Sequence, residues 1–238
     1  PGARAEAPAP APLPAREAAW RENNLGVALL EQFRFADAVG AFGRALEKDP
    51  SLLAARINLA IAQLYVPDIP AAKQAAEEAL KAAPLAPQPN YILALIARSE
   101  GRAEDAVPYV RNVLEMDPRD LGANVTLGQV YLQTRQFEEA AAAFRVALAS
   151  EPYNVSAAYN LGVALTRAGK REEGQEAMAA FQKLRDSAYK SALGSNYLEQ
   201  GKYAEALAST GAEPEAVDAK TPPISLVETA EAVPGAST

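Results

Sequence analysis

Apolar and polar positions along this chain follow the spacing of amphipathic helices, and the pattern repeats every 34 residues. Apolar side chains recur three, four and seven positions apart, which is typical of helices that bury one face. In each period a leucine precedes a small residue: Leu25-Gly26, Leu59-Ala60, Leu93-Ala94, Leu127-Gly128 and Leu161-Gly162. Such a period predicts one small unit copied along the chain, each copy burying its apolar face against its neighbours.

Within each period the pattern predicts two antiparallel helices joined by a short turn. We count Gly26 as the eighth position of the first unit and Ala38 as the twentieth. Small residues at these two positions of each unit allow the two helices to approach closely. Glycines follow the first helix of several units and end it: Gly101, Gly169 and Gly201. Prolines follow the second helix and prevent it from continuing, because proline has no amide hydrogen for the helix: Pro50, Pro84, Pro118 and Pro152.

The fourth unit, with Leu127-Gly128, Tyr131, Ala140, Phe144, Ala147 and Pro152, resembles the tetratricopeptide repeat (TPR) family. The first unit matches nearly as well, whereas the second and third keep the alanines and prolines without the aromatic residues. A sixth unit starts at Leu193-Gly194, continues through Tyr197, Gly201, Tyr203 and Ala206, and then stops. The resemblance covers residues 19–209. It implies an all-α fold, a right-handed α-solenoid of antiparallel helix pairs with five units plus a partial sixth.

Composition divides the chain into three parts. Residues 1–17 form a linker rich in alanine and proline, residues 18–209 form the repeat array, and residues 210–238 form an irregular tail with one short strand at 224–227. Residues 188–213 resemble, more narrowly, the end of the TPR segment in bacterial proteins in which repeats precede an FG-GAP-type propeller and an ASPIC/UnbV-like domain. The tail is then either a free end or a linker to a missing downstream domain.

The composition argues against several classes of function. A net charge of -7 disfavours nucleic-acid binding, which needs clustered lysine and arginine. The chain has neither cysteine nor histidine, so thiol nucleophiles, Cys/His metal sites and the usual general base are absent. No phosphate-binding loop or nucleophile elbow occurs. We therefore expect no enzyme activity, no catalytic residues, no metal and no cofactor. No apolar stretch is long enough to insert into a membrane.

The resemblance implies that the first helix of each unit lines a concave groove, and this groove is the expected binding surface. An asparagine amide can bond both the donor and the acceptor of an extended peptide backbone, and aromatic side chains are common interface anchors. Asn23 and Thr126 share this face. The alternative is that the tyrosines only pack between helices. The partner-binding residues that we predict are Trp20, Asn24, Asn58, Tyr65, Tyr91, Arg98, Gln129, Tyr159, Asn160 and Arg167.

These observations favour a non-enzymatic scaffold that binds a protein or peptide, either as an extended segment or as a partner helix. The alternative is a structural or oligomerisation arm of a larger exported multidomain protein, self-associating as a homo-oligomer through its edge helices. Because the chain starts at Pro1 rather than at methionine, we interpret its N-terminus as trimmed. This start and the narrower resemblance favour a periplasmic or exported bacterial protein, with a cytoplasmic adaptor as the alternative.

Overall fold

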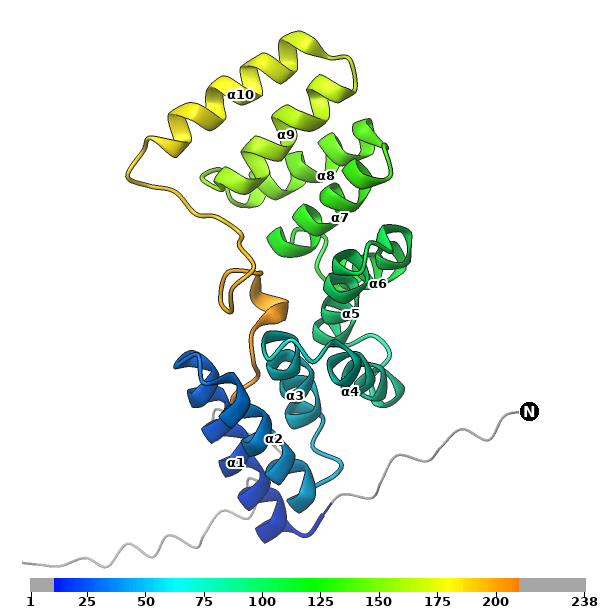
Figure 1. Cartoon of the computed structure of the whole chain (residues 1–238), viewed down its shortest axis with the longest axis vertical. Helices are drawn as coiled ribbons and strands as arrows, with labels where there is room; N and C mark the ends of the chain where they lie inside the picture. Colours follow the sequence, from blue (N-terminus) through cyan, green and yellow to red (C-terminus); the bar gives the residue numbers. More distant parts are fainter. Residues whose placement is uncertain (1–10, 210–238) are drawn as a thin grey trace, which may run out of the picture.

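The described part of the chain is a stack of five helix pairs. The computed structural model describes residues 11–209 (Figure 1). The expected strand at 224–227, most of the linker and the tail lie outside the described residues. The pairs are α1 (Leu13–Glu31) with α2 (Phe35–Lys48), α3 (Leu53–Tyr65) with α4 (Ile69–Ala82), α5 (Pro87–Ser99) with α6 (Ala103–Met116), α7 (Leu121–Gln133) with α8 (Phe137–Ser150), and α9 (Val155–Arg167) with α10 (Arg171–Arg185).

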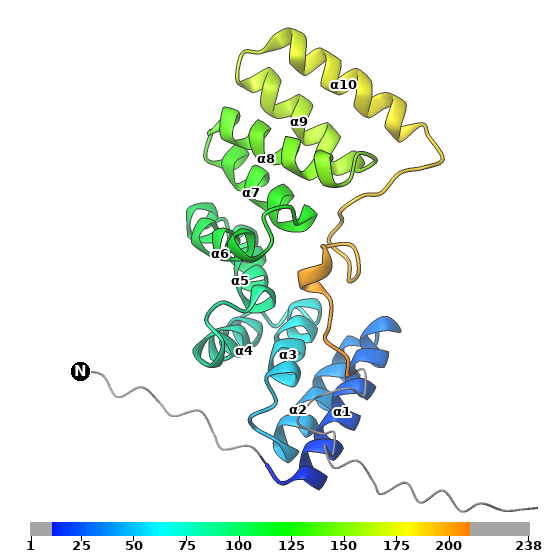
Figure 2. The ribbon, with the colours of Figure 1, turned by 180° about the vertical axis from the view of Figure 1, so that it is seen from behind.

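The first helices of the units form one continuous layer. Contacts join α1 to α3, α3 to α5, α5 to α7 and α7 to α9. Figures 1 and 2 show the pairs following one another from α1 to α10 in an arc, with the last described residues on its inner side. This arrangement is the all-α solenoid that the 34-residue period predicts. The first helix begins at Leu13, earlier than the predicted start of the array at residue 18, because a proline is well tolerated in a first turn and Pro14 occupies one.

Close approach inside each pair depends on the residue at the eighth position of the unit. A β-carbon on Gly128 would lie 2.6 Å from ring atoms of Phe144, and one on Gly26 would lie 2.4 Å from the ring of Phe42. Both rings are fully buried. Where the eighth residue is alanine, in the second and third units, the residue at the position of the phenylalanines is Ala76 or Val110. The two positions share a constant space, so glycine accompanies a large partner and alanine a small one.

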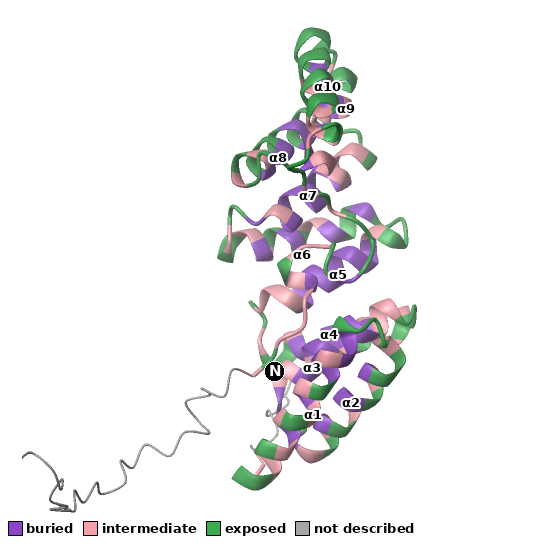
Figure 3. Ribbon diagram, turned by 90° about the vertical axis from the view of Figure 1, so that its left-hand side faces the viewer, coloured by how far each residue is buried: buried purple, intermediate pink, exposed green. Residues whose placement is uncertain are grey.

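Buried asparagines also hold the turns between units. The Asn90 amide donates to the carbonyl oxygens of Pro84 and Ala86 at 3.2 and 2.8 Å. Asn124, one period later, donates in the same way to Pro118 and Asp120 at 3.1 and 2.8 Å. Figure 3 shows the buried positions concentrated where the helices face one another. These asparagines bond carbonyl groups of the linkers that lead into α5 and α7, so their role is structural.

The partial sixth unit does not form, and this part of the prediction is wrong. After α10 the chain turns back and carries a single 3-10 turn, η1 (Lys202–Ala204), within residues 186–209. Gly194 and Gly201 weaken any helix here, and the described residues supply no second helix for it to pack on. Tyr197 and Ala204 are instead 3% and 1% exposed, against the array itself.

Candidate functional site: a groove occupied by the chain itself

Residues 186–209, called the return segment below, leave α10 and run along the inner side of the arc towards α1 (Figures 1 and 2). The segment is first tied to the fifth unit. The Ser191 N–H donates to the Tyr153 carbonyl at 3.0 Å, and the Val155 N–H donates to the Ser191 carbonyl at 2.8 Å. The Ser156 hydroxyl then accepts from the Leu193 N–H and donates to its carbonyl, both at 3.0 Å. These contacts fix the direction in which the chain enters the groove.

In the middle of the groove the return segment lies directly against α5 and α7. The Tyr91 hydroxyl donates to the Gln200 carbonyl at 2.6 Å and lies 3.3 Å from the Thr126 hydroxyl. Tyr91 is fully buried, and burial raises the pKa of its hydroxyl well above the usual value. Two glycines allow this approach. Gly201 has φ +96, and a β-carbon on it would lie 3.1 Å from the α-carbon of Gly122.

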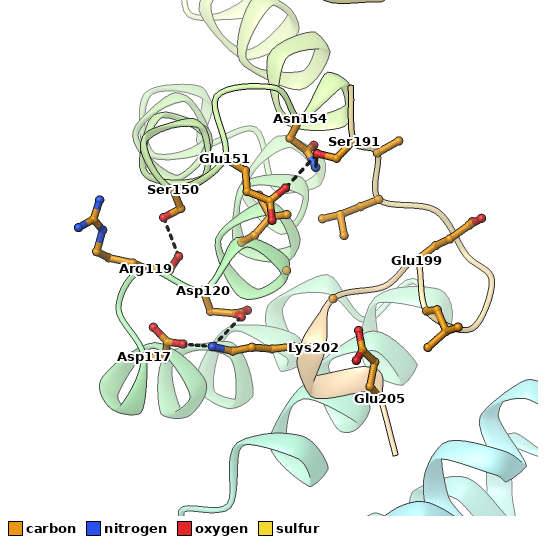
Figure 4. Close-up of a pocket in the computed structure, with 16 residues that line it drawn as sticks. Asp117, Arg119, Asp120, Ser150, Glu151, Asn154, Ser191, Glu199, Lys202 and Glu205 are labelled. Atoms are coloured by element: carbon orange, nitrogen blue, oxygen red, sulfur yellow. Dashed lines mark hydrogen bonds and ion pairs between the residues drawn. The ribbon is translucent and has the colours of Figure 1, made fainter. Parts of the chain in front are cut away.

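A charged contact flanks the glycines. The Lys202 ammonium bonds the Asp117 carboxylate and lies 3.8 Å from Oδ2 of Asp120 (Figure 4). The Tyr203 hydroxyl donates to Asp117 at 3.3 Å. The hydrogen bond from Lys202 lowers the pKa of Asp117, whereas burial raises the pKa of Asp120. Asp120 also caps α7, because its carboxylate accepts from the Ala123 N–H at 2.7 Å. A cavity of about 500 Å³ opens beside this contact.

Three aromatic rings meet where the segment reaches the second unit. The Tyr197 ring lies 5.4 Å from that of Tyr65 and 6.4 Å from that of Phe35, edge-on to both, and Phe35 stacks on Tyr65 at 5.4 Å. We call Phe35 and Tyr65 the aromatic box. The Tyr65 hydroxyl oxygen is buried and has no hydrogen-bond partner among the described residues. The box thus offers two ring surfaces and one unsatisfied polar atom.

Three asparagines hold the end of the segment by its backbone. The Leu207 N–H donates to Oδ1 of Asn58 at 2.7 Å, and Nδ2 of Asn58 donates to the Leu207 carbonyl at 2.8 Å. Nδ2 of Asn23 donates to the same carbonyl at 2.9 Å, and Oδ1 of Asn24 accepts from the Ser209 N–H at 2.9 Å. We call Asn23, Asn24 and Asn58 the amide clamp. The amide clamp therefore bonds main-chain donors and acceptors, and it does not depend on which side chains the bound segment carries.

Four of the ten predicted residues touch the return segment, namely Asn24, Asn58, Tyr65 and Tyr91. Two more lie beside it, since Arg98 bonds Gln129 and both line a cavity of about 230 Å³ next to Gly194 and Gln200. The other four lie elsewhere. Trp20 packs on a small core with Ala45 and Leu52, Asn160 donates to the Ser156 carbonyl of its own helix at 2.9 Å, Tyr159 packs against Phe181 with ring centroids 5.3 Å apart, and Arg167 lies over Phe137 at 6.0 Å.

The sequence prediction missed Phe35 and Tyr197. Phe35 starts the second helix of its unit, which a rule based on first helices does not reach, and Tyr197 was assigned to the sixth unit. Asn23 and Thr126 were placed on the correct face without being selected. For Asn23 a signal exists in the sequence. It directly precedes Asn24, which the 34-residue period places in register with Asn58.

Within residues 11–209, no cluster of three or more acidic side chains is arranged to hold a metal ion. No helix in this described range has both the length and the hydropathy needed to cross a membrane.

Comparisons with known proteins agree with this architecture. One tetratricopeptide repeat model matches residues 23–66, 57–120 and 125–192, and a second matches residues 97–149. No curated protein matches the chain in sequence. Among solved structures, MamA from Desulfovibrio magneticus is 19% identical with a TM-score of 0.65, covering 71% of this chain and 97% of its own. YrrB, a TPR protein with an unusual peptide-binding site, is 22% identical with a TM-score of 0.60, covering 71% and 88%. The repeat models span well over half of the sequence, and the chain belongs to the tetratricopeptide repeat family.

Proposed function

We propose that this protein is a non-enzymatic interaction scaffold that holds an extended polypeptide segment in its concave groove. The observation that carries the proposal is the amide clamp, in which Asn58 bonds both the N–H and the carbonyl of one residue, Leu207. The structural likeness to YrrB, whose own description includes a peptide-binding site, supports the same reading. The groove would hold a partner in the place that residues 194–209 occupy here.

The clamp favours an extended partner over a helical one. In an α-helix the N–H and the carbonyl groups are already engaged with residues four positions away. A main chain that offers both groups of one residue to a single side-chain amide must be extended at that point, and residues 206–209 form no helix or turn. The partner helix that the sequence left as an option therefore does not suit this part of the groove.

Recognition through the backbone would leave specificity to the aromatic box and to the charged contact at Asp117. Aromatic rings in pockets supply much of the binding free energy of protein interfaces, whereas exposed charges mainly select the partner. The groove therefore combines a contact that tolerates many sequences with two contacts that do not.

A panned library of random peptides tests this function directly. Peptides selected on the intact protein would be measured by titration calorimetry against the intact protein, Asn58→Ala and Tyr65→Ala. We expect at least tenfold weaker binding to both variants. Arg111→Ala, on the exposed side of the outer helix α6, is the control and should bind as the intact protein does. Peptides that bind all four proteins equally would place the binding surface outside the groove.

Self-association, the competing function, finds no support at the last helix. Terminal repeats need a polar outer face, and the exposed positions of α10 are mostly charged or polar, among them Glu172, Gln175 and Lys183. The role of the array as an arm of a larger exported protein stays a prediction.

A further inference from the structure

We propose that residues 194–209 are a displaceable internal ligand, and that the partner is a peptide that reproduces their chemistry. This partner would carry an aromatic residue, then a turn containing glycine followed by a basic residue, and then an extended apolar stretch. The proposal rests on the function proposed above and adds both the kind of partner and the competition that it must overcome.

The segment is attached to the array as a ligand would be. All five units are complete without it, because each has both of its helices. The segment itself contains one 3-10 turn and is held at separate points: Tyr197 in the aromatic box, Gln200 on Tyr91, Lys202 on Asp117, and Leu207 in the amide clamp. Removing the segment would therefore expose the groove without removing an element of the solenoid.

The aromatic anchor and the clamped residue are brought together by the turn between them. Tyr197 is 3% exposed, and its hydroxyl accepts from the Ala206 N–H at 3.2 Å, one residue before Leu207. Because Gly201 lies in this turn at φ +96, other residues would be strained there. A partner would need the same turn to fill both subsites at once.

Charge is complementary at the turn. The array supplies the carboxylates of Asp117 and Asp120, and the segment supplies the ammonium of Lys202. A partner with glutamate at this place would bring like charges together, which destabilises an interface. This contact selects a basic residue next to the glycine.

One polar atom of the groove has no hydrogen-bond partner in the internal ligand, so an external peptide could bind the groove more tightly. The buried Tyr65 hydroxyl has no partner among the described residues although it adjoins the Tyr197 ring. A buried polar atom left unpaired weakens a complex. A peptide that places a carbonyl or hydroxyl there would gain a hydrogen bond that the internal segment lacks.

The internal ligand has the advantage of being tethered. Residues 186–193 connect it to α10 and are themselves bonded to the fifth unit, so its effective concentration at the groove is high. The apparent affinity of an external peptide falls by the fraction of molecules in which the groove is open. The intact protein is then selective for partners that outcompete its own segment.

The probe for the test is a fluorescent peptide with the sequence of residues 194–209, capped at both ends. It would be titrated against the intact protein and against the double variant Tyr197→Ala/Leu207→Pro. In this opened variant the segment loses its aromatic anchor and the N–H that donates to Asn58. We expect the probe to bind this opened variant at least tenfold more tightly. Tyr189→Ala makes the same tyrosine substitution at a residue 80% exposed in the same segment, and should match the intact protein.

Two further measurements and a substitute variant complete the test. Adding Asn58→Ala to the opened variant should abolish the gain, and a probe with alanine in place of Tyr197 should bind at least tenfold more weakly. If the double variant proves unfolded by circular dichroism, Lys202→Glu replaces it, because it opens the segment without touching the box or the clamp. Equal binding to intact and opened proteins would overturn the competition while leaving the proposed function standing. If the probe bound neither the intact protein nor the opened variant, the internal-ligand proposal would be overturned. The proposed function would then be tested by the library peptides alone.

Discussion

Asn58 and Leu207 are 149 residues apart in sequence, yet one side-chain amide satisfies both main-chain groups of the leucine, at 2.7 and 2.8 Å. The contact crosses from the second repeat to the last described residues of the chain. It closes the inner side of the solenoid at the units nearest the N-terminus. Through it, the stability of the groove and the placement of the return segment depend on each other.

Asn58→Ala should release the end of the segment without unfolding the array. A net hydrogen bond contributes about 0.5–1.5 kcal/mol, so loss of the pair predicts roughly tenfold faster amide exchange at Leu207. Hydrogen–deuterium exchange with peptide resolution measures this. Asn160→Ala is the matched control, because Asn160 bonds its own helix at Ser156. Equal protection of Leu207 in the two variants would contradict the role assigned to the clamp.

Gly128→Ala should destabilise the protein. The new β-carbon would lie 2.6 Å from the fully buried ring of Phe144, and overpacking of this kind costs about 1–3 kcal/mol, more than the helix propensity of alanine returns. Gly43→Ala is the control, because nothing lies within 4 Å of its β-carbon position in α2. That variant should gain about 0.5–1 kcal/mol. Urea unfolding of both variants checks the sign, and a stable Gly128→Ala would mean that α8 can shift.

Gly201→Ala should loosen the return segment where it crosses α7. The backbone at φ +96 is strained for alanine, by about 1–3 kcal/mol, and the added carbon approaches Gly122. Trypsin should then cleave after Lys202 several times faster under native conditions. Gly169→Ala imposes a similar strain at φ +79, in the turn of the fifth unit, with open space around it. Equally fast cleavage after Lys202 in the two variants would show that general destabilisation explains the effect.

Acid should weaken the contact between Asp117 and Lys202. The hydrogen bond from Lys202 lowers the pKa of Asp117 in the folded protein, so this stabilisation is present above the unfolded pKa of about 4 and is lost as the pH falls through the folded value. Asp117→Asn removes this dependence. Between pH 5 and pH 3 the stability of the unsubstituted protein should fall relative to the variant, by a small amount because Lys202 is exposed and Asp117 is partly exposed. Parallel urea titrations of the two proteins would refute this if their difference did not change with pH.

The repeat architecture could be predicted because its causes are local and recur. The 34-residue period places prolines after second helices and small residues where helices cross, and each unit packs only on its neighbours. The fourth unit pairs Gly128 with Phe144, whereas the third unit pairs Ala94 with Val110. This difference can be found in the sequence once the period is known. The expected concave face, with Asn58 and Tyr91, came from the resemblance to the repeat family rather than from the period itself.

The path of residues 186–209 was decided only by the tertiary structure. Leu193-Gly194, Tyr197 and Ala206 match the start of another repeat. Gly194 and Gly201 weaken a helix here, but earlier units that do form helices also have glycine at the matching positions. The deciding contacts come from helices far away in the chain: the aromatic box buries Tyr197, and the amide clamp satisfies the backbone at Leu207. A sixth helix pair would need a second helix to bury its apolar face, whereas the finished groove already offered burial and hydrogen bonds. The sequence by itself thus determined the solenoid, and the assembled solenoid determined where the rest of the described chain lies.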